Sequence, residues 1–276
     1  MNVNFISNDY LLAWNLLFKP SFCKEIQELK ERLWLNHHEV YLSMENENIE
    51  ILKYGDDFIP DNNTIYDEIF ETKIFEKVRK QTESHRKFLL DAWDNNRLEI
   101  AEKFKQVTRL KLREKYTIMV VHPELDCVEY IKTNPVKRIA WGKLDDRDDS
   151  FKTLMRIIYT VLKYEIGDYQ KENREIVAAI IDLAITNEVA TLIKGKTQYE
   201  EGFKKLRLLK KQLYPYWLMY LGADKEALLN YMMRDKTSFE IDEYQMEAQL
   251  AKVDIYGFID FCCHNQKYII RLTNLN

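Results

Sequence analysis

The sequence predicts an α+β fold that is predominantly α-helical, with a small mixed sheet between an N-terminal helical half and a C-terminal helical half. Three observations predict this class. The 276 residues include only 7 glycines and 5 prolines, too few for the many turns of an all-β fold. Apolar residues recur at helical intervals through most of the chain. One cluster of β-branched and apolar residues, Tyr116–Val121, interrupts that pattern.

The N-terminal half is expected to be helical. Tyr10–Phe18 is an apolar and aromatic helical pattern, and a second helix is expected from Ser21, a residue type that caps helix N-termini well. Residues 54–63 combine Gly, Pro, Asp and Asn, which predicts a loop. Thr64–Leu110 then predicts a long helix with a break near Asp94–Asn96.

Strands are expected mainly in the middle of the chain. Tyr116–Val121 has the composition of a buried strand. Asp126–Thr133 is predicted as a second strand or a loop, and Arg138–Gly142 as a third, short strand. Asp145–Asp149 is rich in acidic residues and predicts a solvated loop.

The C-terminal half is again expected to be helical. Asp149 or Ser150 caps a helix that runs to Ile166. The next helix, Glu172–Ile193, ends at Gly195, which suits the left-handed conformation common after a helix. Further helices are expected over Thr197–Leu213, Tyr216–Leu221, Lys225–Met233 and Asp242–Cys263, and a terminal strand over Tyr268–Leu272.

This order of elements suggests two parts. Residues 1–115 form an N-terminal helical region, and residues 116–276 form a domain with the small sheet and the remaining helices. The alternative is one continuous domain, because no low-complexity linker separates the parts.

Composition excludes several classes of partner. The net charge is -4, and no segment concentrates Lys and Arg without matching acids, which argues against binding to nucleic acid. The apolar run Leu11–Phe18 is too short to cross a bilayer, so no membrane partner is expected. The spacing of Cys23, Cys127, Cys262 and Cys263 fits neither a disulfide framework nor a zinc ribbon. Reduced thiols and a cytoplasmic location are therefore expected.

One constellation in the second half has the spacing of a metal site without its ligands. A zinc peptidase helix carries two His four residues apart with a Glu after the first, and a third ligand follows on a later helix. At the centre of the helix that ends at Ile166, the corresponding residues are Tyr159, Thr160 and Lys163. Asp182 lies nineteen residues beyond Lys163.

In this spacing, and in the order of strands and helices, residues 116–221 resemble the gluzincin-type zinc metallopeptidases. The resemblance implies a zincin-like fold. It also implies that Tyr159, Thr160 and Lys163 replace the first His, the general-base Glu and the second His, with Asp182 at the place of the third ligand. Because the imidazoles and the base are replaced, we expect no metal, no cofactor and no hydrolysis by the usual route.

The resemblance further implies a cleft that binds a peptide. In gluzincins an edge strand pairs with an extended peptide substrate, and Ile139–Gly142 has that place in the order of elements. Ile139 and Trp141 are therefore candidate peptide-binding residues. Tyr216 and Tyr220 lie beyond the ligand helix and are candidates for the border of the cleft. The implied partner is a peptide or a protein.

A plain helical domain explains the same residues. The helix Phe151–Ile166 is amphipathic, so Tyr159 and Lys163 can be an ordinary surface pair. Val177–Leu183 is almost wholly apolar, so Asp182 is expected to be buried and to need a partner. The expected partner is Lys163, in an ion pair that takes the place of the metal site.

Other candidate chemistries have less support. His37 and His38 are expected as a surface pair, and His122, at a strand end, as a packed residue, because apart from the adjacent pair no two histidines have metal-ligand spacing. No Gly-x-Ser-x-Gly elbow, Walker loop or dinucleotide fingerprint occurs. The aromatic stretch over residues 214–221 follows a basic helix face and is expected to anchor the core.

Three function classes remain open. The first is a non-catalytic, metallopeptidase-like protein that binds a peptide or protein in a cleft, with altered motif positions at Tyr159, Thr160, Lys163, Asp182 and Glu188. The second is a helical adaptor or regulatory protein without peptidase ancestry. The third is a metallopeptidase whose ligands the motifs do not identify. No residue is assigned a catalytic role, and the first class is favoured.

Overall fold

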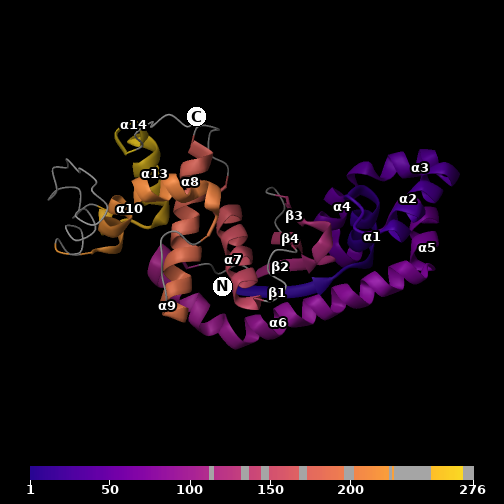
Figure 1. Ribbon diagram of the computed structural model, residues 1–276, viewed down its shortest axis with the longest axis horizontal. Helices are drawn as coiled ribbons and strands as arrows, with labels where there is room; N and C mark the ends of the chain where they lie inside the picture. Colours follow the sequence, from indigo (N-terminus) through magenta and orange to yellow (C-terminus); the bar gives the residue numbers. More distant parts are fainter. Residues whose placement is uncertain are drawn as a thin grey trace. The chain divides into compact units, whose positions relative to one another are not determined.

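The structure is a computed structural model that describes residues 1–111, 115–131, 137–143, 149–167, 173–195, 202–223, 226 and 250–269. The chain divides into two compact units. Unit 1 consists of residues 1–96 and 112–157, and unit 2 consists of residues 97–111 and 158–276. The predicted α+β class is confirmed in that the described residues are mostly helical and include one small mixed sheet (Figure 1), while the zincin-like fold stays a prediction. The units do not follow the predicted division at residue 115.

The sheet belongs to unit 1 and has four strands in the order β1-β2-β4-β3. The strands are β1 (Asn2–Ser7), β2 (Lys115–Val120), β3 (Cys127–Tyr130) and β4 (Lys137–Gly142). β1, β2 and β4 run parallel, and β3 is antiparallel to β4. The strands predicted over Tyr116–Val121 and Arg138–Gly142 are therefore confirmed, and within Asp126–Thr133, predicted as a strand or a loop, Cys127–Tyr130 is a strand. β1 is a strand that the sequence analysis did not predict.

Cross-strand packing explains why the N-terminus joins this sheet. Phe5 of β1 lies beside Ile118 of β2, which lies beside Ile139 of β4. All three side chains are at most 2% exposed, so they form one apolar row across the sheet. Val3 is buried on the same strand as Phe5, whereas the alternating Asn2 is exposed, as the two-residue period of a strand requires.

Several helices of unit 1 pack into one core, which also contains sheet residues such as Met119 and Ala140. In α1 the run Leu11–Leu17 is buried, and Asn8 caps the helix by accepting a hydrogen bond from the backbone N–H of Leu11 at 2.9 Å. The helices are α1 (Asp9–Phe18), α2 (Lys24–Asn36), α3 (His38–Ser43), α4 (Glu47–Tyr54), α5 (Thr64–Phe70) and the first part of α6 (Lys73–Thr108), with 3-10 turns η1 (Met44–Asn46), η2 (Gly55–Asp57) and η3 (Pro123–Leu125).

The break predicted in the long helix lies elsewhere. The chain leaves the helix between α5 and α6, where the Thr72 hydroxyl accepts a hydrogen bond from the backbone N–H of Phe75 at 3.2 Å. The predicted break near Asp94–Asn96 is wrong, because α6 continues through it. The Asn96 side chain donates to the carbonyl of Ala92 at 2.7 Å, a bond that lets Asn remain within a helix.

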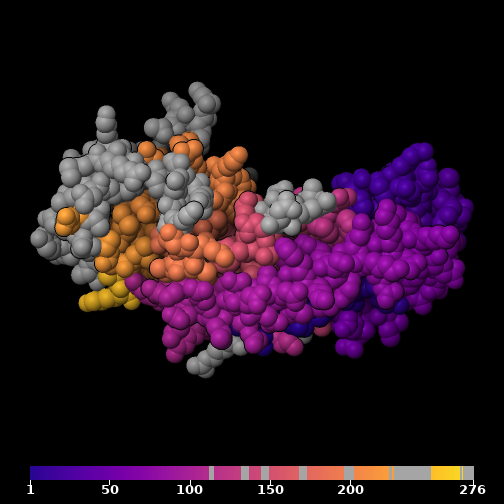
Figure 2. Space-filling model, turned by 60° about the horizontal axis from the view of Figure 1, so that its bottom comes forward, coloured from indigo at the N-terminus to yellow at the C-terminus, as the bar shows by residue number. Residues whose placement is uncertain are grey.

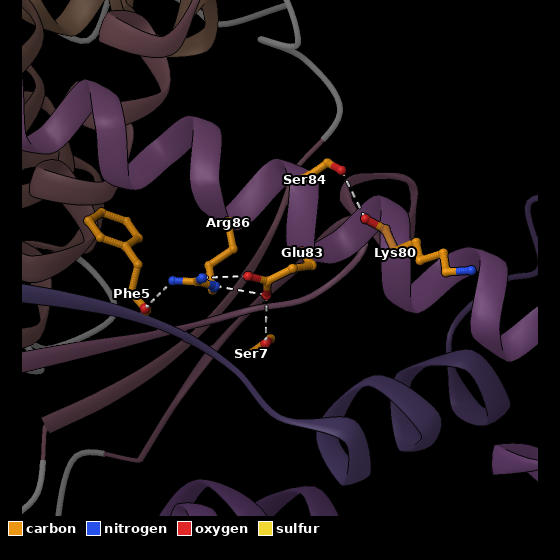
Figure 3. Close-up of polar contacts among 6 residues, drawn as sticks. All are labelled: Phe5, Ser7, Lys80, Glu83, Ser84 and Arg86. Atoms are coloured by element: carbon orange, nitrogen blue, oxygen red, sulfur yellow. Dashed lines mark hydrogen bonds and ion pairs between the residues drawn. The ribbon is translucent and has the colours of Figure 1, made fainter.

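The two outer strands of the sheet, β1 and β3, differ in what contacts their outer sides. The free side of β1 meets α6: Arg86 donates to the carbonyl oxygen of Phe5 at 3.3 Å, and Glu83 accepts from the hydroxyl of Ser7 at 3.1 Å (Figure 3). Arg86 also binds Glu83, which fixes the guanidinium (Figure 3). Figure 2 shows the α6 residues of unit 1 at the surface on this side of the unit. β3, the other outer strand, pairs with β4 alone among the described strands.

All the regular elements of unit 2 within its described residues are helical. It contains the end of α6 and the later part of α7 (Ser150–Ile166), of which residues 150–157 belong to unit 1. Its other elements are α8 (Arg174–Asp182), the π-helical segment η5 (Leu183–Val189), α9 (Ala190–Lys194), the turn η6 (Lys204–Leu206), α10 (Arg207–Leu221), α13 (Ile255–His264) and α14 (Gln266–Ile269).

Several predicted boundaries in unit 2 change. The helices expected on either side of Pro215 are one helix, α10, with the proline inside it. In the described part of the helix expected over Asp242–Cys263, residues 251–254 are not helical, and α13 begins at Ile255, where Asp254 accepts from the backbone N–H of Gly257 at 3.1 Å. Ile269 ends a helix rather than extending a strand. The predictions over residues 145–148, 197–201, 227–233, 242–249 and 270–272 lie outside the described residues.

Candidate functional site

Asp182 is the residue around which the candidate site is built. It ends α8, within the apolar run that the sequence analysis singled out, and its side chain is 0% exposed. A carboxylate in that position loses its hydration and must be matched by donors from the protein. The prediction that Asp182 is buried is confirmed, but the prediction of its partner is not.

Lys210 supplies the positive charge. Its Nζ lies 2.8 Å from Oδ2 of Asp182, and both side chains are 0% exposed. Lys210 belongs to the stripe of α10 that also contains Leu213 and Trp217, both buried. This stripe faces the core, so the helix that carries Lys210 directs an ammonium group inward. The result is a buried ion pair between α8 and α10.

Asn187 provides a second oxygen acceptor for the ammonium. Its Oδ1 accepts from Lys210 Nζ at 2.8 Å. Asn187 lies five residues after Asp182, and the intervening segment, η5, is π-helical. Since a π-helix bonds residue i to residue i+5, it places side chains five apart over one another. The local change from α to π helix therefore lets both oxygens reach the same cation.

A close approach of the backbone adds one more donor to the carboxylate. The backbone N–H of Phe203 donates to Asp182 Oδ2 at 3.1 Å. Gly202, just before it, has φ +96°, and a Cβ on Gly202 would collide with the Asp182 carboxylate. A glycine is therefore required there. Among the described residues no donor reaches Asp182 Oδ1.

The three altered motif positions on α7 do not form a pocket around Asp182. Lys163 is exposed, so the predicted ion pair between Lys163 and the fully buried Asp182 is wrong. The helix turns Lys163 outward because its apolar stripe, not Lys163, faces the core. Tyr159 and Thr160 are buried, and the Tyr159 ring lies 5.0 Å from the ring of Phe203. Tyr159 therefore contacts the ring of Phe203, whereas Asp182 binds the backbone N–H of the same residue.

Glu188 is a second, half-buried carboxylate in the same segment. It accepts a hydrogen bond from the indole N–H of Trp217 at 3.2 Å. Burial raises the pKa of the Glu188 carboxyl, and the bond from Trp217 opposes part of that shift. Glu188 is therefore separate from the ion pair, although its neighbour Asn187 belongs to it.

The residues predicted to bind a peptide are core residues. Ile139 is 0% exposed and Trp141 is 2% exposed. The prediction that Ile139–Gly142 is an edge strand is wrong, because β4 pairs with β2 on one side and with β3 on the other. A strand whose two sides are both paired offers no backbone groups to a peptide.

Tyr216 and Tyr220 likewise pack inside unit 2. The hydroxyl of Tyr220 donates to the carbonyl of Val107 at 2.7 Å, and its ring lies 4.3 Å from the guanidinium of Arg109. Tyr216 is buried against the ring of Phe261 at 6.0 Å. Aromatic anchoring of the core, which the sequence analysis expected for this stretch, explains both residues.

The comparisons with known proteins identify no relative. No family model matches the chain, and neither a curated protein nor a solved structure matches it. Within the described ranges, no group of three or more His, Cys, Asp or Glu side chains is placed to hold a metal ion. The site must therefore be interpreted from its own chemistry.

The sequence analysis missed Lys210, which is the most informative residue of the site. One signal was present: Leu206, Lys210, Leu213 and Trp217 recur at helical intervals, which puts a lysine on an apolar stripe. Asn187 carried no such signal, because its position depends on the π-helical segment. The arrangement is a solvent-excluded ion pair that can hold α8 and α10 together.

The segment that carries Asp182 also has the composition of a membrane span. Among the described residues, one helix, Arg174–Lys194, is long and apolar enough to cross a bilayer. Most of that stretch is buried inside the protein, and the charge of Asp182 within it is paired. These are the properties of a central core helix of unit 2.

Proposed function

We propose that this protein is non-catalytic and binds a peptide, or an extended segment of a protein, at the edge of its sheet. One observation carries the non-catalytic part: the Asp182 carboxylate is already bound to the buried ammonium of Lys210 at 2.8 Å. The gluzincin resemblance places Asp182 at the third zinc ligand. A metal ion at that carboxylate would have to displace a desolvated cation and leave it unpaired, at a large electrostatic cost.

The residues at the other motif positions support the same proposal. Tyr159, Thr160 and Lys163 offer a phenol, an alcohol and an ammonium in place of the imidazoles and carboxylate that zinc peptidases use. The proposal includes a cytoplasmic location, where thiols remain reduced: Cys127, Cys262 and Cys263 are buried, and Cys23 is half-exposed.

The binding part of the proposal rests on the outer strand β3. Backbone groups on an outer strand can pair with an added strand, a common mode of peptide recognition. The β1 edge is already engaged by Arg86, which donates to Phe5. β3 is the antiparallel outer strand, and Val128, Glu129 and Tyr130 are half-exposed along it, with the Glu129 carboxylate bound by Lys19 and Asn48. The peptide site is therefore assigned to β3 in place of β4.

Metal analysis and a hydrolysis assay test the non-catalytic part. Purified protein dialysed against micromolar zinc should retain no stoichiometric metal that depends on Asp182, and it should not cleave a mixed peptide library. Asp182→Asn is the comparison variant. Stoichiometric zinc, or cleavage that disappears in Asp182→Asn, would contradict the proposal.

Hydrogen–deuterium exchange tests the binding part. Peptides selected from a random library on the full chain should slow exchange over residues 127–130 and leave residues 2–7 unchanged. β1 is the matched control, because it is the other outer strand of the same sheet. If no peptide is selected, or if protection appears only outside β3, the assignment fails.

A further inference from the structure

A pocket of about 440 Å³ lies in unit 1, beside the carboxyl end of β2 and away from Asp182. Its walls come from the two residues before α2, one face of α6 and the turn η3 that follows β2. Parallel strands direct their carboxyl ends toward the ligand sites of α/β proteins, and β2 lies between two parallel neighbours. The volume is in the range of pockets that bind small molecules.

A flat aromatic pair forms part of the lining. The rings of Phe22 and His122 are stacked with their centroids 4.6 Å apart and an angle of 6° between them. His122 is 5% exposed, and its Nδ1 accepts a hydrogen bond from the backbone N–H of Glu124 at 3.3 Å, which fixes the ring. Val78 and Pro123 are buried beside this pair. Such a surface favours a planar, apolar group.

The rim is formed by polar and aromatic side chains of α6. Lys77 and Gln81 lie one turn apart on the same face, and Phe88 follows two turns later. Phe88 is 38% exposed, unusual for a side chain of its size, and it extends the apolar lining toward solvent. Lys77 is exposed and supplies a positive charge, which the Glu25 carboxylate also faces, and Glu124 supplies a carboxylate from η3.

We propose that this pocket binds a small aromatic carboxylate. The aromatic ring packs against Phe22 and His122, and the carboxylate pairs with Lys77. Aromatic contact provides most of the affinity, and the charge-assisted hydrogen bond provides orientation. Glu124 further determines whether an α-ammonium group is accepted, as in an aromatic amino acid. This inference is independent of the peptide site proposed at β3.

Cys23 provides a direct reporter, because it lines the pocket and is half-exposed while the other three cysteines of the chain are buried. The full chain is treated with iodoacetamide in the presence of 3-phenylpropionate, L-phenylalanine or the neutral 3-phenylpropionamide, and Cys23 alkylation is followed by mass spectrometry. At ten times its Kd, a bound carboxylate should slow alkylation about tenfold. Protection by either carboxylate supports the proposal, and their relative affinities show the role of Glu124.

Two variants make the result specific. Lys77→Gln should weaken the carboxylate about tenfold, which is the effect of losing one charge-assisted bond. Lys80→Gln is the matched control, since Lys80 is exposed on the same helix and pairs with Glu76 at 2.6 Å. Lys80→Gln should not change affinity. Absence of protection by both carboxylates, equal binding of the neutral amide, or equal affinity in Lys77→Gln would overturn the assignment.

Discussion

The two units place their charged contacts differently. In unit 1 the ion pairs lie at the periphery: Arg86 binds Glu83 beside the outer strand, and Lys19 binds Glu129 with both side chains about a quarter exposed. In unit 2 the pair Lys210–Asp182 is completely buried. Water can replace a lost partner in unit 1 but not in unit 2. Removing one partner of an ion pair should therefore change stability little in unit 1 and strongly in unit 2.

The largest expected effect is that of removing the buried cation. Lys210→Met keeps the length of the side chain but leaves Asp182 as an unpaired buried charge. Unfolding in urea should show a loss of about 3–5 kcal/mol. Lys163→Met is the matched control, because Lys163 is an exposed lysine of the same unit, and its effect should be within about 0.5 kcal/mol.

A double variant tests whether that loss comes from charge or from packing. Adding Asp182→Asn to Lys210→Met removes the orphaned charge and should recover a large part of the lost free energy, with a coupling of about 1–3 kcal/mol. Strictly additive effects of the two substitutions would show that the ion pair is not the source of the loss.

Removing the second acceptor should cost less. Asn187→Leu leaves the charge of Lys210 paired with Asp182 but takes away one hydrogen bond in a dry environment. The expected loss in denaturant unfolding is about 1–3 kcal/mol. If the free energy of unfolding is unchanged, the π-helical segment does not stabilise the fold through the hydrogen bond between Lys210 and Asn187.

In unit 1 the corresponding change should scarcely affect stability. Arg86→Ala removes the ion pair with Glu83 and the donor to Phe5, and the expected loss is at most about 1 kcal/mol. Arg86→Ala should instead speed amide hydrogen exchange in β1, because a long side chain no longer contacts the outer side of that strand. Lys80→Ala, on the same helix, should leave β1 exchange unchanged. Equal exchange in both variants would remove the distinction between the two sheet edges.

The smallest effect concerns pH. Because burial raises the pKa of Glu188, the folded protein holds this proton more tightly than the unfolded chain. The contribution of Glu188 to stability is therefore full below its ordinary pKa and decreases as pH rises through the raised value. Glu188→Gln should consequently be more stable than the native protein near neutral pH and equal to it in acid, as thermal unfolding across pH would show.

The helices were easier to predict than the strands that complete the sheet. The apolar spacing of α1 and α7 is local, so their ranges agree with the sequence analysis within a residue or two. β1 was not predicted because its six residues form a strand only by pairing with β2, where Phe5 lies beside Ile118, more than a hundred residues away in sequence. The predicted break at Asp94–Asn96 is wrong for a local reason. The Asn96 side chain forms a hydrogen bond within the helix, so the helix continues.

The site shows the same limit. Burial of Asp182 followed from its apolar neighbours, but its partner did not follow from sequence distance. Lys163 has the motif spacing yet is exposed, whereas Lys210 reaches Asp182 through the packing of α10. The role of β4 was also set by tertiary structure, because β3 pairs beside it and takes the outer position. Pairings between distant segments are the part that a single sequence does not determine.

The interleaving of the units has a consequence for synthesis. Every residue of unit 1 precedes residue 158, so this unit can complete its sheet while the rest of the chain is still being translated. Residues 97–111 belong to unit 2 and must wait for partners from the C-terminal helices. Ile100, Phe104 and Val107, each at most 2% exposed in the finished protein, are meanwhile unprotected on the nascent chain.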